Sequence, residues 1–211
     1  MPLQNRVDPF GNIHAVADRG ACLGNRGILH DDHRHLIHYH RHQAWIICRL
    51  EFKGRQRTVM TPNAYTELFF LDEVTALAAG HRPCAECNRP RYNEFKRLWQ
   101  QAHPHSRDAI DTVLHRARFV PRQRDWRQKK RTYTARLDDL PDGAFVTLAA
   151  SDEAIPFLVL AEALYPWHFD GYGHPSPRPT DQVVTVLTPE PTVRILAAGY
   201  RPDIHPVSPH K

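Results

Sequence analysis

The spacing of apolar positions predicts helices in the first half of the chain. Residues 89–102 read RPRYNEFKRLWQQA, and Pro90 stands in the first turn of the expected helix, where proline is favoured. The apolar side chains of this segment recur at the spacing of a helical turn: Tyr92, Phe95, Leu98 and Trp99. A further short helix is expected over residues 107–117.

Apolar runs broken by turn residues predict strands ahead of these helices. Residues 44–60, AWIICRLEFKGRQRTVM, are expected to form two strands joined by a turn at Lys53-Gly54. Residues 65–71, YTELFFL, predict another strand. Asp72 can then cap a helix over residues 72–79, and Gly80 stands where a left-handed residue ends a helix.

From Leu137 onward the pattern changes to short apolar runs separated by proline and glycine. Residues 140–148, 156–164 and 182–188 predict strands, and the intervening GYGHPSPRPT, residues 171–180, predicts an irregular loop. Helices followed by strands of this kind indicate an α+β fold.

One ten-residue pattern occurs twice. VTALAAGHRP, residues 74–83, and VRILAAGYRP, residues 193–202, share seven residues, and a strand-like run precedes each copy. We interpret the pair as one strand, helix and Gly-x-Arg-Pro unit used twice. The first copy continues into Cys84-Ala-Glu-Cys87 and the second into Asp203-Ile-His205, so the turn itself does not require the cysteines.

The four cysteines are the strongest indication of chemistry. The N-terminal sequence lacks the apolar segment of a secretory signal, and no apolar run approaches the roughly 18 residues of a membrane span, so we expect a cytoplasmic protein. Cysteines in that compartment indicate a metal site or reactive thiols rather than structural disulfides.

Cys84 and Cys87 have the spacing of a zinc knuckle, a turn that presents two thiolates just before a helix. Redox-active Cys-x-x-Cys pairs follow a strand, whereas a helix ending in glycine precedes this one. Cys48, in the strand-like AWIICRLEF, is the best third zinc ligand. Either Cys22 or His30 can provide the fourth, and zinc accepts both types of site.

The segment LAAGHRPCAEC resembles the GYRPCxxC signature of the Ada-type zinc domain of bacterial alkyl-phosphotriester repair proteins, which is also appended to some nucleases. GNRGILH, residues 24–30, resembles a stretch found in the nuclease-associated versions, and the resemblance extends over residues 24–99. It implies His30 as the partner of Cys48. The whole chain also resembles a bacterial family whose members begin MPLQNRV.

The resemblance and the charge distribution divide the chain into three regions. We expect an Ada-like zinc-binding module over residues 1–106, a basic connector over 107–136, and a small β-rich part over 137–211 that contains the second repeat. The net charge of the chain is +5, but the connector has ten basic and three acidic side chains, whereas residues 137–211 have four and ten. The basic excess is therefore concentrated in the connector.

Such a basic segment with interspersed aromatic residues favours contact with DNA or RNA. The candidate phosphate-binding side chains are Arg116, Arg118, Arg122, Arg124, Arg127, Lys129, Lys130 and Arg131. The alternative is a solvated basic loop packed on the acidic C-terminal part. The leading hypothesis is thus a zinc-binding protein that associates with nucleic acid.

Two other functions are compatible with the sequence. Six of the 15 histidines lie between His30 and His42, where they can bind a catalytic ion of a hydrolase or nuclease, or form a solvated loop. Glu67, Asp72 and Glu73 are acidic candidates for such a site, although helix capping accounts for the last two. The same histidines can instead make the chain a metal- or pH-responsive interaction protein.

Overall fold

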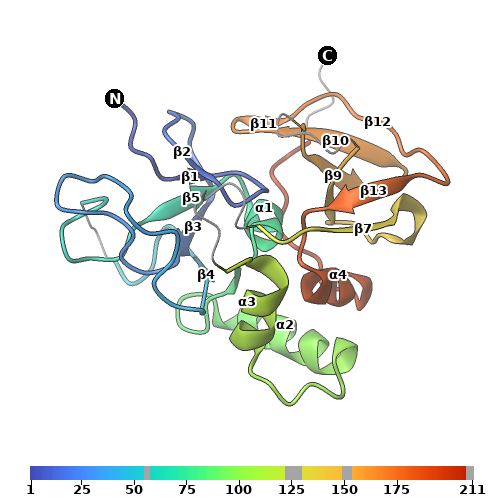
Figure 1. The fold of residues 1–211 in the computed structure, drawn as a ribbon, viewed down its shortest axis with the longest axis horizontal. Coiled ribbons are helices and arrows are strands. Elements are labelled where there is room, and N and C mark those ends of the chain that lie inside the picture. The colour runs from blue at the N-terminus through green and yellow to red at the C-terminus, as the bar shows by residue number, and fades with distance from the viewer. Residues whose placement is uncertain (55–57, 122–129, 149–153, 208–211) are drawn as a thin grey trace.

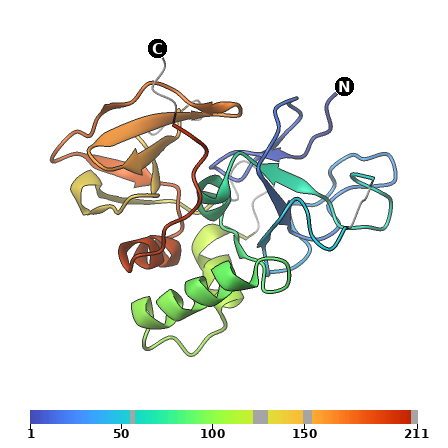
Figure 2. The ribbon, with the colours of Figure 1, turned by 180° about the vertical axis from the view of Figure 1, so that it is seen from behind.

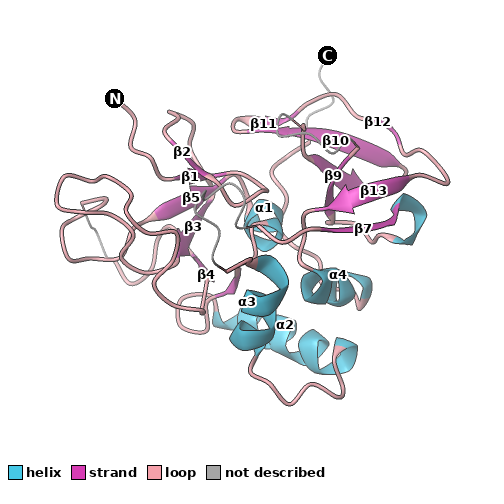
Figure 3. Cartoon of the chain, in the orientation of Figure 1, coloured by secondary structure: helices cyan, strands magenta, loops and turns pink. Residues whose placement is uncertain are grey.

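The chain forms two β-sheets with helices between and below them (Figures 1 and 3). The structure is a computed structural model that describes residues 1–54, 58–121, 130–148 and 154–207. None of the helices in these residues combines the length and apolar character that crossing a bilayer requires. The α+β class expected from the sequence is confirmed.

The first sheet has six short strands in the order β2-β1-β5-β3-β4-β6. The β1–β5 and β4–β6 pairs are parallel and the others antiparallel. Its strands are β1 Arg6–Val7, β2 Ile13–His14, β3 Cys22–Asn25, β4 Ile46–Cys48, β5 Leu68–Phe70 and β6 Arg82–Pro83. Most have two or three residues, too few for an alternating pattern to be visible in the sequence.

The first strand of the predicted hairpin over residues 44–60 is confirmed, whereas residues 55–57 of the predicted second strand lie outside the described residues. β4 forms, and Lys53 and Gly54 both have positive φ, as a tight turn requires. No second strand follows in residues 58–60, which form turns instead. The strand predicted over 65–71 is confirmed as the shorter β5.

The helices agree more closely with the sequence. They are α1 Glu73–Ala78, α2 Arg89–Ala102, α3 Ile110–Arg118 and α4 Glu190–Ala197. The Asp72 carboxylate accepts a hydrogen bond from the Thr75 N–H, which confirms the predicted cap of α1. α2 has the predicted bounds, and its Phe95, Leu98 and Trp99 side chains are buried.

The second sheet has the order β11-β10-β9-β8-β13-β7, and β12 pairs with β10; only β7 comes from the connector, and the other strands belong to the C-terminal part. A 3₁₀ helix of three residues, Leu137–Asp139, follows β7. The strands are β7 Tyr133–Arg136, β8 Phe145–Thr147, β9 Phe157–Leu160, β10 Ala163–His168, β11 Gly171–Tyr172, β12 Ser176–Pro177 and β13 Val183–Val186. The expected loop at 171–180 therefore contains two short strands.

The two Gly-x-Arg-Pro units end their helices in the same way. Gly80 and Gly199 have φ of 90° and 105°, and the following His81 and Tyr200 donate their backbone N–H to Ala76 and Ile195, respectively. With the accompanying glycine N–H bonds, these form a Schellman motif at each helix end. The sequence repeat is thus a structural repeat.

Helix α1 lies between the two sheets in both views of the ribbon (Figures 1 and 2). One side contributes Ala76 and Leu77 to a core shared with α2 and α4, and the other contributes Val74 and Ala78 to a core with the second sheet. The C-terminal part consequently packs on the N-terminal part through continuous apolar contact.

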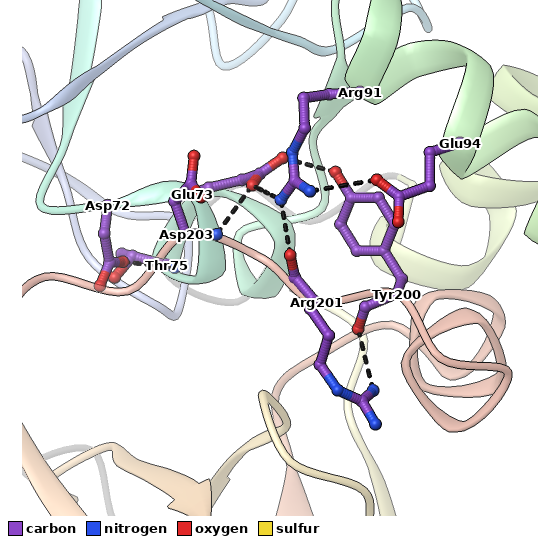
Figure 4. A network of polar contacts seen from close by, with 8 residues as sticks. All are labelled: Asp72, Glu73, Thr75, Arg91, Glu94, Tyr200, Arg201 and Asp203. Atoms are coloured by element: carbon purple, nitrogen blue, oxygen red, sulfur yellow. Dashed lines mark hydrogen bonds and ion pairs between the residues drawn. The ribbon is translucent and has the colours of Figure 1, made fainter.

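Two carboxylates at the start of α1 also hold the C-terminal segment (Figure 4). Asp72 accepts hydrogen bonds from the Tyr172 hydroxyl at 2.7 Å and the His205 N–H at 2.9 Å. Glu73 accepts from the Tyr200 hydroxyl at 2.6 Å and the Asp203 N–H at 2.9 Å, and it pairs with Arg91 of α2. These acids therefore have structural roles.

Candidate metal centre

Three of the four cysteines meet where β4 and β6 end. The parallel pairing places Ile47 beside Pro83, and the Cys84 N–H donates to the Ile47 carbonyl at 2.9 Å. Cys48 and Cys84 therefore lie at the ends of two adjacent strands. The turn before α2, closed by an Asn88 N–H bond to the Cys84 carbonyl, returns Cys87 to the same place. The three sulfur atoms lie within 4.8 Å of one another.

The electrostatics of the cluster favour a bound cation. Burial and the neighbouring Cys84 raise the pKa of the Cys48 thiol well above its usual range, and burial also raises the pKa of Cys87. Burial opposes ionisation of Cys84 too, but backbone N–H groups of Cys87 and Glu86 donate to its sulfur and bring its pKa below the ordinary value. Three adjacent thiolates repel one another unless a cation compensates them.

The donor set fits zinc or another thiophilic ion. All four cysteines of the chain are free of disulfides. Zinc–thiolate bonds of about 2.3 Å place two sulfurs of a tetrahedral site about 3.8 Å apart, so the observed cluster needs only a small contraction. The pairing of β4 with β6 brings Cys48 close to Cys84. The two residues are 36 positions apart in the sequence, so their spacing alone does not predict this proximity.

His30 does not join the three thiols. Its ring is buried, with Nδ1 2.6 Å from the Thr66 hydroxyl and Nε2 3.3 Å from the Thr61 carbonyl. Both ring nitrogens thus have partners within the fold, and the residue fixes the loop before β5. The family-derived pairing of His30 with Cys48 is not formed in this structure.

Cys22 is also separate, and the register of the sheet explains why. Leu23 is directly opposite Cys48, so the side chain of Cys22 projects from the other face of the sheet. There it packs against the main core. Burial, followed by the charge of Glu73, raises the pKa of the Cys22 thiol to about 12. Cys22 is therefore a neutral core thiol.

A cavity of about 470 Å³ opens beside the cluster, lined by all three cysteines. Its other walls come from β3 and β5, from residues 49–52 after β4, and from Val59 and Tyr65. In the described part of the chain, the cysteines are the one group of three or more His, Cys, Asp or Glu side chains close enough to share an ion. A metal ion held by these three thiols would lie beside this cavity.

The histidine-rich segment does not assemble a second metal group among the described residues. Residues 31–42 form no strand, and one isolated bridge joins His30 to Leu36. His33, His35 and His42 are exposed, and His38 and His40 are half-buried. His40 packs on the rings of His115 and Phe119, so it belongs to an aromatic cluster rather than to an ion site.

The basic connector proves to have two different roles. Arg118 is 1% exposed and donates to the Gly80 carbonyl at 2.6 Å, while Lys130 donates to the Ala78 carbonyl. Both cations bind carbonyls at the C-terminus of α1, where positive charge is favoured. Burial lowers the pKa of Lys130 to about 7. These two side chains are not available to phosphate groups.

The remaining cations of the connector divide between the surface and the part of the chain that is not described. Arg116 is exposed and paired with Asp108, and Arg131 is exposed. Four candidates lie outside the described residues: Arg122, Arg124, Arg127 and Lys129. No family model, curated protein or solved structure matches this chain.

Proposed function

We propose that this protein binds one zinc ion through Cys48, Cys84 and Cys87. The observation that carries the proposal is the convergence of three thiols from separate segments to within 4.8 Å. Structural zinc sites have four protein ligands, whereas sites that act on a bound molecule keep one position for water or substrate. Three thiols beside a cavity favour the second kind.

The experiment is metal analysis of the purified chain, supported by the absorption of the cobalt-substituted protein. We expect about one zinc per chain, and thiolate-to-cobalt charge-transfer bands. The Cys48→Ser and Cys84→Ser variants should lose most of the metal, since each leaves two thiols. Cys22→Ser is the matched control, because Cys22 projects from the opposite face of the sheet, and it should retain the full content.

Two results would overturn the proposal. One is a wild-type chain that takes up no zinc or cobalt when refolded with either ion. The other is loss of metal from Cys22→Ser or His30→Gln to the same extent as from Cys48→Ser, with each variant's fold verified by circular dichroism.

Association with nucleic acid is a second proposal, favoured by two candidate cations of the connector that lie on the surface. Arg116 and Arg131 are exposed, whereas Arg118 and Lys130 bind α1. Binding to short DNA and RNA duplexes and single strands should weaken steeply as salt is raised, since neutralised phosphates release counterions. Absence of binding at low salt would end this proposal without affecting the zinc site.

A further inference from the structure

We infer that the cavity beside the three thiols binds a small organic molecule carrying an amino group, which Glu67 recognises. The inference rests on the proposed zinc site for one end of the molecule. The zinc ion offers its fourth position to an atom with a lone pair, and the carboxyl group of Glu67 accepts hydrogen bonds from the amino group at the other end.

The register of the sheet places Glu67 on the same face as the metal ligands. Leu23 is opposite both Phe69 and Cys48, and Asn25 is opposite Ile46. Glu67 lies two residues before Phe69, so its side chain projects toward the same side as that of Phe69. Glu67, Phe69, Leu23 and Cys48 all line the cavity.

The spacing of the strands gives the length that a molecule needs in order to contact both the metal at the cysteines and Glu67. Glu67 is two strands and two residues from Cys48, which corresponds to about 12 Å between their Cα atoms. The side chains and the metal take up part of that length. A molecule of several bonds is therefore required, and a single small ion cannot contact both groups.

Glu67 has the unsatisfied hydrogen-bonding capacity of a recognition residue. Its side chain is 3% exposed, and its Oε2 accepts a hydrogen bond from the Met60 N–H at 2.8 Å. Its Oε1 has no hydrogen-bond partner among the described residues. Buried oxygens without a partner are rare because they lose hydration without compensation. An amino group of a ligand provides the missing donor.

The composition of the walls selects the class of ligand. Among the described residues that line the cavity, Glu51, Glu67 and Glu86 are acidic and Arg49 is the one cation. The remaining walls are mostly apolar or aromatic: Leu23, Ile46, Leu50, Phe52, Val59, Tyr65 and Phe69. A cavity of about 470 Å³ is within the range of small-molecule sites. Its acidic, apolar walls favour an amine with an apolar body over a phosphate or carboxylate.

The test compares two probes that differ only in the amino group. Both 1-(3-aminopropyl)imidazole and 1-butylimidazole present an imidazole nitrogen to the metal, but only the first carries an ammonium group. Each is titrated into the cobalt-substituted full chain while the visible spectrum is recorded. We expect both to change the cobalt spectrum, and the amino probe to bind about tenfold more tightly, the strength of one charge-assisted hydrogen bond.

The Glu67→Gln variant identifies the group responsible. Its amide oxygen can still accept from the Met60 N–H, so the fold and the metal content should be retained. The tenfold preference should fall to nearly one, whereas binding of 1-butylimidazole should stay unchanged. Glu51→Gln is the matched control, because it removes an exposed carboxyl group from the same cavity and should preserve most of the preference.

The outcomes separate this inference from the zinc proposal. A chain without cobalt bands overturns the zinc site, and the inference with it. A chain with cobalt bands that neither probe alters overturns the inference alone. Equal affinity for the two probes, or a preference that persists in Glu67→Gln, does the same.

Discussion

Removing one hydroxyl group from Tyr200 should destabilise the whole protein measurably. The side chain is 0% exposed, and its hydroxyl donates to Glu73 Oε1 at 2.6 Å across the junction of the N- and C-terminal parts. Burial and the negative charge of Glu73 raise the pKa of Tyr200 far above its usual range, so the hydroxyl stays a donor. Tyr200→Phe keeps the ring, which packs against Phe95 and below Arg91.

The expected loss in the free energy of unfolding follows from the hydrogen bonds that Glu73 keeps in the Tyr200→Phe variant. Its Oε2 keeps Arg91 and the Asp203 N–H, but Oε1 loses its hydroxyl donor in a buried setting. Leaving such an acceptor unpaired costs about 1–3 kcal/mol. A loss of about 2 kcal/mol in the free energy of unfolding corresponds to a decrease in Tm of about 4–8 °C for a chain of this length.

The assay is urea unfolding followed by tryptophan fluorescence, with the Tm measured by calorimetry on the same samples. Tyr165→Phe is the control, because Tyr165 is a half-buried tyrosine of the C-terminal sheet, and it should change the free energy of unfolding by less than 0.5 kcal/mol, the usual limit for such positions. Equal losses in the two variants would refute the reasoning. Combining Tyr200→Phe with Glu73→Gln should cost less than the sum of the single changes, and strict additivity would also contradict it.

Three further predictions concern the surroundings of α1. Gly80→Ala should destabilise the protein more than Gly199→Ala in the same urea assay. Both changes place an alanine in the left-handed conformation, which costs about 1–2 kcal/mol. Only at Gly80 would the new Cβ also lie 2.4 Å from Arg118 Cδ. Equal losses would mean that Arg118 moves aside freely. Burial and the charge of Arg26 hold the pKa of His81 well below 6.5, so unfolding takes up a proton and stability should fall as pH drops below about 6.5, by up to about 1.4 kcal/mol per pH unit. His81→Gln should flatten that dependence between pH 7 and 5, and an unchanged slope would contradict the assignment. Finally, Arg118→Gln should lower the Tm without changing the salt dependence of any DNA binding, whereas Arg116→Gln should reduce that dependence; the reverse result would place Arg118 at the nucleic acid.

The sequence predicts best where structure is determined locally. The bounds of α2, the cap at Asp72 and the repeated helix ends follow from residues within a few positions of one another. The Cys84–Cys87 pair belongs to this class, because its turn is local. The strand-like pattern around Cys48 predicts it as the third ligand, and the structure brings its sulfur to the pair.

The remaining features depend on contacts between distant segments. Cys22 and Cys48 both lie in strands, and only the register, which follows from pairing across the sheet, shows that they face opposite sides. Likewise, Arg118 and Lys130 look like other connector cations until the fold places them at the end of α1. Neither the unpaired Oε1 of Glu67 nor the cavity beside it can be predicted from residues that are close in the sequence.

The hydrogen bonds at the start of α1 also determine the order in which contacts can form while the chain is being synthesised. Asp72 and Glu73 leave the ribosome long before their partners, since Tyr172 follows Asp72 by 100 residues and His205 follows it by 133. At about 5–20 residues per second, that delay is about 5–27 s. The nascent chain must keep these carboxylates hydrated during that interval. Helix α1 therefore acquires its final contacts only after residue 205 has been made, whereas the three thiols, all within residues 48–87, can meet on a chain that is still incomplete.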